Sequence, residues 1–261
     1  MKSRRLPPMM SLAAHSLAAL ASILLLSCRT AQTSDPKIIG GSKTSGDPAV
    51  VAIYVEIMAR EKRFMCTGAL IAPDTVLTAA HCLDQPRLGF AHVFRVYAGD
   101  DLSDKNNRPK MFTGRKAFFH PKFNFKDPKG GYDIGLLKLN EPMDIEPIPY
   151  LRGAMPSGML GEKARVVGFG QSNSLIGTGS EVKRTASVKL EGLDEKFLRI
   201  GGFFHNVCNG DSGGPVMMII DGVETIVGVN SFGDGSCHSE SYATRLDQYS
   251  TEFMEPILSG S

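Results

Sequence analysis

The sequence predicts an all-β fold, organised as a barrel or a sandwich. Beyond residue 37, apolar residues alternate with polar ones or form short runs, as expected for strands rather than helices. Twenty-eight glycines and fifteen prolines divide these runs with turns, and apolar residues at helical spacing are scarce. Many short strands separated by turns are typical of barrels and sandwiches.

Eight segments have the length and composition of strands. In chain order they are residues 50–58, 64–72, 93–98, 134–139, 164–169, 182–190, 215–220 and 225–229. One helix is expected near the end of the chain, over residues 246–254, and Pro256 is expected to stop it. The proline-rich residues 141–156 are the expected connection between two halves of the fold.

Composition and charge exclude two classes of protein. With 42% hydrophobic and 21% charged residues, the chain can bury a core, which excludes intrinsic disorder. Residues 1–37 hold five of the 29 basic residues and one of the 27 acidic ones, so the remainder has a net charge of −2. That balance lacks the basic surface that nucleic acid requires, so no nucleic-acid partner is expected.

The amino-terminal segment predicts export. Three basic residues precede an apolar run over residues 11–26, which is the order of a secretory signal, and residues 1–27 are assigned to it. The run is too short and too rich in alanine and serine for a membrane span of about 20 residues. It ends in Leu-Leu-Ser-Cys, which resembles the lipobox of bacterial lipoproteins and implies a lipid on Cys28. The alternative is an ordinary signal peptide with Cys28 in the discarded part. Either way the product is secreted or periplasmic, and the lipid is the only membrane attachment expected.

The remaining four cysteines indicate disulfides. Their number is even, and an exported protein meets an oxidising environment. No Cys-x-x-Cys spacing occurs among them, which disfavours a zinc site. The spacing alone leaves three pairings open for Cys66, Cys82, Cys208 and Cys237.

Three distant segments supply the parts of a nucleophilic catalytic set. His81 lies in TAAHC after an apolar strand, Asp133 precedes the apolar run IGLL, and Ser212 lies in the glycine-rich CNGDSGGP. A serine hydroxyl needs a base, histidine suits that role, and a buried carboxylate can orient the imidazole. A lone histidine or aspartate at such a position is usually structural, whereas the glycine density around Ser212 is specific, because it lets backbone N–H groups converge on an oxyanion.

Four motifs together resemble the trypsin/chymotrypsin-like serine proteases. These are IIGG at residues 38–41, TAAHC, YDIGLLKL and GDSGGP, in the order that the family has. The resemblance extends from Ile38 to about Pro256. It implies two six-stranded antiparallel β-barrels and a short C-terminal helix, with the active site between the barrels. The protease domain is then residues 38–261, with barrels at about 38–145 and 150–245 and a helix at about 246–256, and residues 28–37 form a propeptide.

The resemblance assigns roles to the motif residues. His81 is implied as the general base, Asp133 as its orienting carboxylate and Ser212 as the nucleophile. The backbone N–H groups of Gly210 and Ser212 are implied as the oxyanion hole. A substrate backbone is expected to pair, as an added strand, with Ser231, Phe232 and Gly233.

The same resemblance implies a disulfide pattern and an activation step. The expected disulfides are Cys66–Cys82 and Cys208–Cys237. Cleavage between Lys37 and Ile38 is expected to free an ammonium group that pairs with Asp211 and orders the oxyanion hole.

The position six residues before Ser212 is implied as the base of the specificity pocket. Trypsin-like enzymes place aspartate there to bind arginine or lysine, whereas this chain has Asn206. Gly233 is expected to leave the pocket open and Ser241 to narrow its floor. A neutral P1 residue is therefore predicted.

The expected protein is an exported serine endopeptidase, made as a zymogen, which forms an acyl-enzyme. Its partners are protein or peptide substrates and a separate activating protease, and it is expected to be a monomer with no cofactor and no metal. The alternative from another class is a catalytically silent pseudoprotease that acts as a binding module. An esterase with the same triad is disfavoured, because its serine lies in G-x-S-x-G and its histidine comes last.

Overall fold

The computed structural model describes residues 38, 41–57, 62–84, 92–106, 109–171, 180–202, 206–234 and 236–260. All of these belong to one compact unit, Pro36–Ser261. The expected signal and propeptide, with Cys28 and Lys37, lie outside the described residues.

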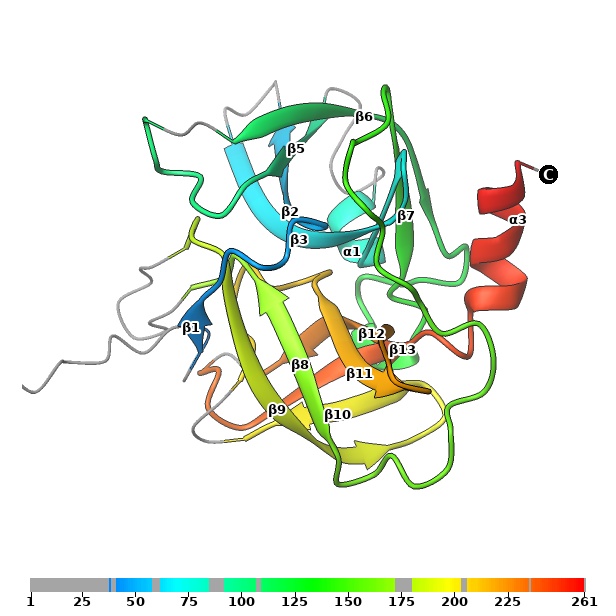
Figure 1. Cartoon of the computed structure of the whole chain (residues 1–261). Helices are drawn as coiled ribbons and strands as arrows, with labels where there is room; N and C mark the ends of the chain where they lie inside the picture. Colours follow the sequence, from blue (N-terminus) through cyan, green and yellow to red (C-terminus); the bar gives the residue numbers. More distant parts are fainter. Residues whose placement is uncertain are drawn as a thin grey trace, which may run out of the picture. The chain divides into compact units, whose positions relative to one another are not determined.

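Six antiparallel strands close into a first barrel in the order β2-β3-β4-β7-β6-β5 (Figure 1). They are β2 (Val50–Ile57), β3 (Lys62–Ala72), β4 (Thr75–Thr78), β5 (His92–Ala98), β6 (Lys110–Phe119) and β7 (Gly135–Leu139). Pairing of β2 with β5 completes the ring, so none of the six strands is left as an open edge.

A second antiparallel barrel has the order β9-β10-β13-β12-β11-β8 and is closed by pairing between β8 and β9. Its strands are β8 (Lys163–Gly168), β9 (Arg184–Leu193), β10 (Phe197–Gly201), β11 (Pro215–Ile220), β12 (Val223–Gly233) and β13 (Glu240–Arg245). The expectation of two six-stranded barrels is therefore confirmed.

The start of the domain lies on the second barrel rather than the first. The short strand β1 (Ser42–Lys43) pairs with β9, and Ile38 is fully buried in the apolar core of the second barrel. The boundary predicted at residue 38 for the first barrel is thus wrong for these residues. The first barrel closes without Ile38 and β1. Burial of the Ile38 side chain in the core of the second barrel stabilises their position there.

Strand β9 has the alternating pattern expected of a strand that is buried on one face. In β9 the alternate residues Ala186, Val188 and Leu190 are buried while their neighbours are more exposed. The sequence pattern did not predict β4, β6, β10 and β13. Strand β4 has only four residues, all buried, and β6 mixes basic and aromatic residues without a clean period of two.

The C-terminal helix begins later than predicted. A π-helical turn, η3 (Ser250–Met254), leads into the α-helix α3 (Glu255–Ser259). Pro256 lies in the first turn of α3, where its missing N–H has no intrahelical partner to lose, so it belongs to the helix rather than stopping it. No helix in the described part of the chain is long and apolar enough to cross a membrane.

The first expected disulfide joins two elements of the first barrel. Cys66 in β3 is bonded to Cys82 in the short helix α1 (Ala80–Leu83), which follows β4. The bond closes a loop with a sequence separation of 16 residues and holds α1 against the barrel.

We predict that the double variant Cys66→Ala/Cys82→Ala loses about 3 kcal/mol of unfolding free energy, the chain-entropy value for a loop of about 15 residues. Urea unfolding of purified protein, followed by circular dichroism, measures the change. A loss below about 1 kcal/mol would contradict this stabilising role of the disulfide.

Candidate active site

The pairing of β4 with β7 brings His81 and Asp133 together. Thr78 at the end of β4 lies opposite Gly135 at the start of β7, so the residues just beyond β4 meet those just before β7. His81 Nδ1 lies 2.8 Å from Asp133 Oδ2, and the His81 backbone N–H donates to Asp133 Oδ1 at 2.9 Å. Two contacts therefore fix the carboxylate relative to α1.

Asp133 is buried, 1% exposed, and accepts further hydrogen bonds from the second barrel. The hydroxyl of Ser231 donates to Oδ2, and the hydroxyl of Thr244 donates to the backbone carbonyl at 3.0 Å. Burial alone raises the pKa of Asp133, but the charge of His81 and the hydrogen bonds from His81 and Ser231 outweigh it and hold the pKa below its usual value. The carboxylate is therefore ionised at neutral pH.

Ser212 lies in a tight turn, residues 208–214, which we call the Ser212 turn. Gly210 and Gly213 have φ values of +99° and +82°, which L side chains rarely adopt. A Cβ on Gly213 would lie 2.0 Å from Thr78 Oγ1, so the first barrel also demands glycine there. The Gly213 N–H donates to the Asn230 carbonyl at 2.7 Å, which ties the turn to β12.

Asp211 is the second buried carboxylate of the site, also 1% exposed. Its oxygens accept hydrogen bonds from the backbone N–H groups of Gly170 at 2.8 Å and Cys208 at 2.9 Å. Burial raises the pKa of Asp211 to about 6, although these two hydrogen bonds and the charge of Arg184 act in the opposite direction. The protonated form is thus unusually favoured for an aspartate.

Thr67 in β3 is a site residue that the sequence analysis missed. Its hydroxyl donates to the Gly210 carbonyl at 2.8 Å and accepts from the Phe169 N–H at 3.2 Å. Its backbone N–H donates to the Ser212 carbonyl at 2.8 Å. The sequence showed only a threonine directly after Cys66 within the predicted strand 64–72, and its full burial is visible in the structure alone.

A cavity of about 250 Å³ opens beside Ser212. Its lining includes Ser231, Phe232, Gly233 and Ser241, all of them predicted substrate-binding residues. The second expected disulfide, Cys208–Cys237, forms and also lines the cavity.

Asn206, the predicted base of the pocket, lies behind Ser241 and does not line this cavity. Asn206 Oδ1 accepts from Ser241 Oγ at 2.6 Å and from the Val207 N–H at 2.9 Å, and Nδ2 donates to the Ser239 carbonyl at 2.8 Å. Because these contacts occupy both ends of its amide, Asn206 supports the floor and Ser241 presents the surface.

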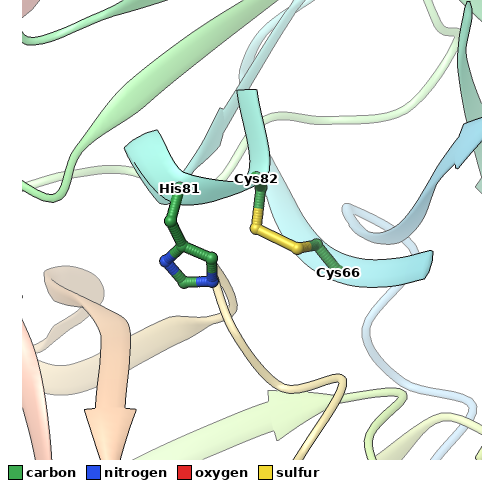
Figure 2. Close-up of side chains that lie close together, drawn as sticks. All are labelled: Cys66, His81 and Cys82. Atoms are coloured by element: carbon green, nitrogen blue, oxygen red, sulfur yellow. A yellow bond between two sulfur atoms is a disulfide. The ribbon is translucent and has the colours of Figure 1, made fainter. Parts of the chain in front are cut away.

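Cys66, His81 and Cys82 lie close together, with one potential ligand atom of each within 4.8 Å of the others (Figure 2). The two sulfurs form the disulfide that Figure 2 draws in yellow, so neither is a thiolate that could bind a metal ion. His81 Nδ1 is hydrogen-bonded to the Asp133 carboxylate. The cluster is therefore a support for α1 rather than a metal centre.

Two closed antiparallel barrels with a histidine–aspartate pair held near a serine turn are one of the architectures that serine endopeptidases use, and this chain is of that class. The family model described as Trypsin matches residues 38–252, so the chain belongs to the trypsin family.

Curated relatives are similar over most of the chain. Chymotrypsin-like elastase family member 1 of Macaca fascicularis is 25% identical over 252 residues, covering 87% of this chain and 91% of that protein. Vitamin K-dependent protein C of Mus musculus is 27% identical over 242 residues, covering 82% and 50% respectively. Urokinase-type plasminogen activator of Gallus gallus is 28% identical over 244 residues, covering 82% and 56%.

We predict that Thr67→Val lowers the free energy of unfolding by about 1–3 kcal/mol for each polar partner left unsatisfied, namely the Gly210 carbonyl and the Phe169 N–H. Thr67→Ser keeps the hydroxyl and is the matched control, expected to lose much less. Urea unfolding of the two variants beside the parent measures the difference. Equal stability of the valine and serine variants would contradict this role of the hydroxyl.

Proposed function

We propose that this chain is an exported serine endopeptidase in which Ser212 is the nucleophile, His81 the general base and Asp133 the carboxylate that orients the base. The observation that best supports the proposal is the 2.8 Å contact between His81 Nδ1 and a buried, ionised Asp133. A carboxylate at Nδ1 selects the tautomer in which Nε2 carries no proton and can accept one from the serine.

The reaction proceeds in two halves through an acyl-enzyme. Ser212 Oγ attacks the peptide carbonyl while its proton passes to His81 Nε2. The oxyanion of the tetrahedral intermediate accepts hydrogen bonds from the N–H groups of Gly210 and Ser212. His81 then protonates the leaving amine, and water repeats the sequence on the acyl-enzyme. Asp133 stabilises the imidazolium in both halves.

Substrates are proteins or peptides bound as an extra strand along residues 231–233, the end of β12. The P1 side chain enters the cavity of about 250 Å³ and is neutral. The position expected to bind a basic P1 side chain holds Asn206, whose amide is engaged by Ser241, Val207 and Ser239.

Activation requires cleavage between Lys37 and Ile38 by a separate protease, because a pocket for neutral side chains does not select Lys37. The new ammonium group of Ile38 pairs with Asp211. Asp211 directly follows the oxyanion-hole residue Gly210. It is buried and its pKa is raised to about 6, so it is suited to a cationic partner.

The precursor is exported as a monomer by the signal in residues 1–27, and a lipid on Cys28 anchors it until the cleavage. The anchor lies on the propeptide side of Lys37, and the described cysteines of the protease domain are paired with one another. Cleavage therefore releases the protease domain from the membrane.

We predict that a fluorophosphonate probe labels the protein cleaved at Lys37 and leaves the uncleaved protein and Ser212→Ala unlabelled. Loss of the nucleophile is expected to reduce turnover by about 10⁶-fold. Gel fluorescence and peptide hydrolysis measure the two effects, with the exposed Ser157→Ala as the matched control. Absence of labelling in correctly cleaved, folded protein would reject the enzymatic function.

We also predict a pH effect that depends on Asp211. Its folded pKa of about 6 lies above the ordinary value of 3.8, so the folded state binds more protons between these values. The stability of the uncleaved protein relative to Asp211→Asn therefore falls by about 3 kcal/mol as pH rises from about 4 to about 6.

Cleavage supplies an ammonium partner that lowers the pKa of Asp211, so the same comparison after cleavage shows a smaller fall or none. Urea unfolding between pH 4 and pH 8, in a Ser212→Ala background that prevents autolysis, tests both statements. An identical pH dependence before and after cleavage would contradict the ion pair.

A further inference from the structure

Asn230 in β12 presents an unpartnered amide in the wall of the cavity beside Ser212. The residue is 2% exposed and lines the cavity. Neither Oδ1 nor Nδ2 has a hydrogen-bond partner in the part of the chain that the structure describes. Its backbone, in contrast, is fully used, since its N–H donates to the Gly214 carbonyl at 2.9 Å and its carbonyl accepts from the Gly213 N–H.

Three other polar side chains of the wall are already engaged. The Ser231 hydroxyl donates to Asp133, and the Ser241 hydroxyl donates to Asn206. The Asp234 carboxylate accepts from the Ser236 hydroxyl and from the His238 and Ser239 N–H groups. These groups shape the cavity, while Asn230 keeps a free donor and a free acceptor.

A buried amide without partners is costly, and such groups in folded proteins usually have a reason. Replacement of Asn230 by an apolar residue of similar size would remove that cost within a strand whose backbone is held independently. A hydrogen-bond partner on the substrate explains why the Asn230 amide is unpaired in the free protein, because the P1 side chain enters this cavity.

We propose that Asn230 recognises a primary amide on the P1 side chain, so that the enzyme cleaves after glutamine or asparagine. This inference rests on the proposed function and specifies its neutral P1 preference. A primary amide offers a donor to Oδ1 and an acceptor to Nδ2 at once, in a two-point pair. A carboxylate cannot donate to Oδ1, an ammonium group cannot accept from Nδ2, and an aliphatic side chain can do neither.

The charge of Asp234 near the cavity disfavours an anionic P1 side chain. The carboxylate of Asp234 lies in the lining and its pKa is lowered to about 2, mainly by hydrogen bonds that outweigh its desolvation, so it stays ionised and opposes an anionic P1 side chain. A site that hydrogen-bonds its substrate also rejects analogues that leave its polar groups unpaired.

The test uses the exported chain cleaved at Lys37 and a set of peptides that differ only at P1, with glutamine, asparagine, glutamate, methionine, leucine and lysine. Mass spectrometry of the products gives kcat/KM for each. We expect glutamine or asparagine to exceed the near-isosteric methionine and leucine by about 10²-fold or more. Equal or greater cleavage after methionine, leucine, glutamate or lysine would overturn the proposal.

Asn230→Leu removes both polar atoms at similar volume, and its ratio of glutamine to methionine cleavage is expected to fall at least tenfold. The ratio is measured within one preparation, so it does not depend on the active fraction. Asn140→Leu, the same change at an exposed position on the first barrel, is the control and is expected to keep the parental ratio. An unchanged ratio in Asn230→Leu would overturn the assignment to Asn230.

Asn230→Asp provides a second variant of nearly identical shape if the leucine variant does not fold. Its carboxylate retains acceptors and loses the donor, so cleavage after lysine is expected to rise relative to glutamine at least tenfold. Probe labelling distinguishes failure of the amide selectivity from failure of the proposed protease function. Labelled protein without amide selectivity overturns this proposal alone, whereas cleaved protein that neither labels nor hydrolyses any peptide overturns the proposed function.

Discussion

The chemistry of this site depends on the contact between Thr67 of the first barrel and the Ser212 turn of the second. His81 and Asp133 lie on the first barrel, and Ser212 lies on the second. The position of Ser212 relative to the other two residues therefore depends on how the two barrels are held against each other. Two hydrogen bonds from Thr67, each 2.8 Å long, fix the carbonyls of Gly210 and Ser212. Ser231 reaches back from the second barrel to Asp133. The constellation is held from both sides, in a region that excludes water, where such bonds are strong.

Two buried aspartates in this region have opposite pKa shifts, and the difference lies in their partners. Each is 1% exposed, and burial raises the pKa of both. Asp133 faces His81 and Ser231, whose charge and hydrogen bond overcome the cost of burial and lower its pKa. For Asp211, the hydrogen bonds from two backbone N–H groups and the charge of Arg184 do not overcome burial, and its pKa rises to about 6. One carboxylate is thus stably ionised, while the other gains most from an added cation.

Sequence patterns predicted features that consecutive residues carry, and the family resemblance supplied the motif residues, but long-range contacts of residues outside the motifs were missed. Alternating apolar residues predicted β9, and the density of glycines predicted the Ser212 turn, because both features depend on consecutive residues. Thr67 acts on Gly210 across 143 positions of sequence, and no local pattern reports that contact. Spacing placed Asn206 at the base of the pocket, but the packing of β13 interposes Ser241. The free amide of Asn230 is likewise visible only once its neighbours are known.

The proposed preference for neutral P1 side chains has a consequence for control of the protein. An enzyme that selects arginine or lysine at P1 can cleave its own precursor at Lys37, and a few active molecules then activate the rest. With Asn206 engaged and Ser241 at its surface, the described part of the pocket floor presents no carboxylate to a basic side chain. The activation bond and the preferred substrate bond are then chemically different. On the proposed function, the amount of active protease follows the activity of a second enzyme instead of growing autocatalytically.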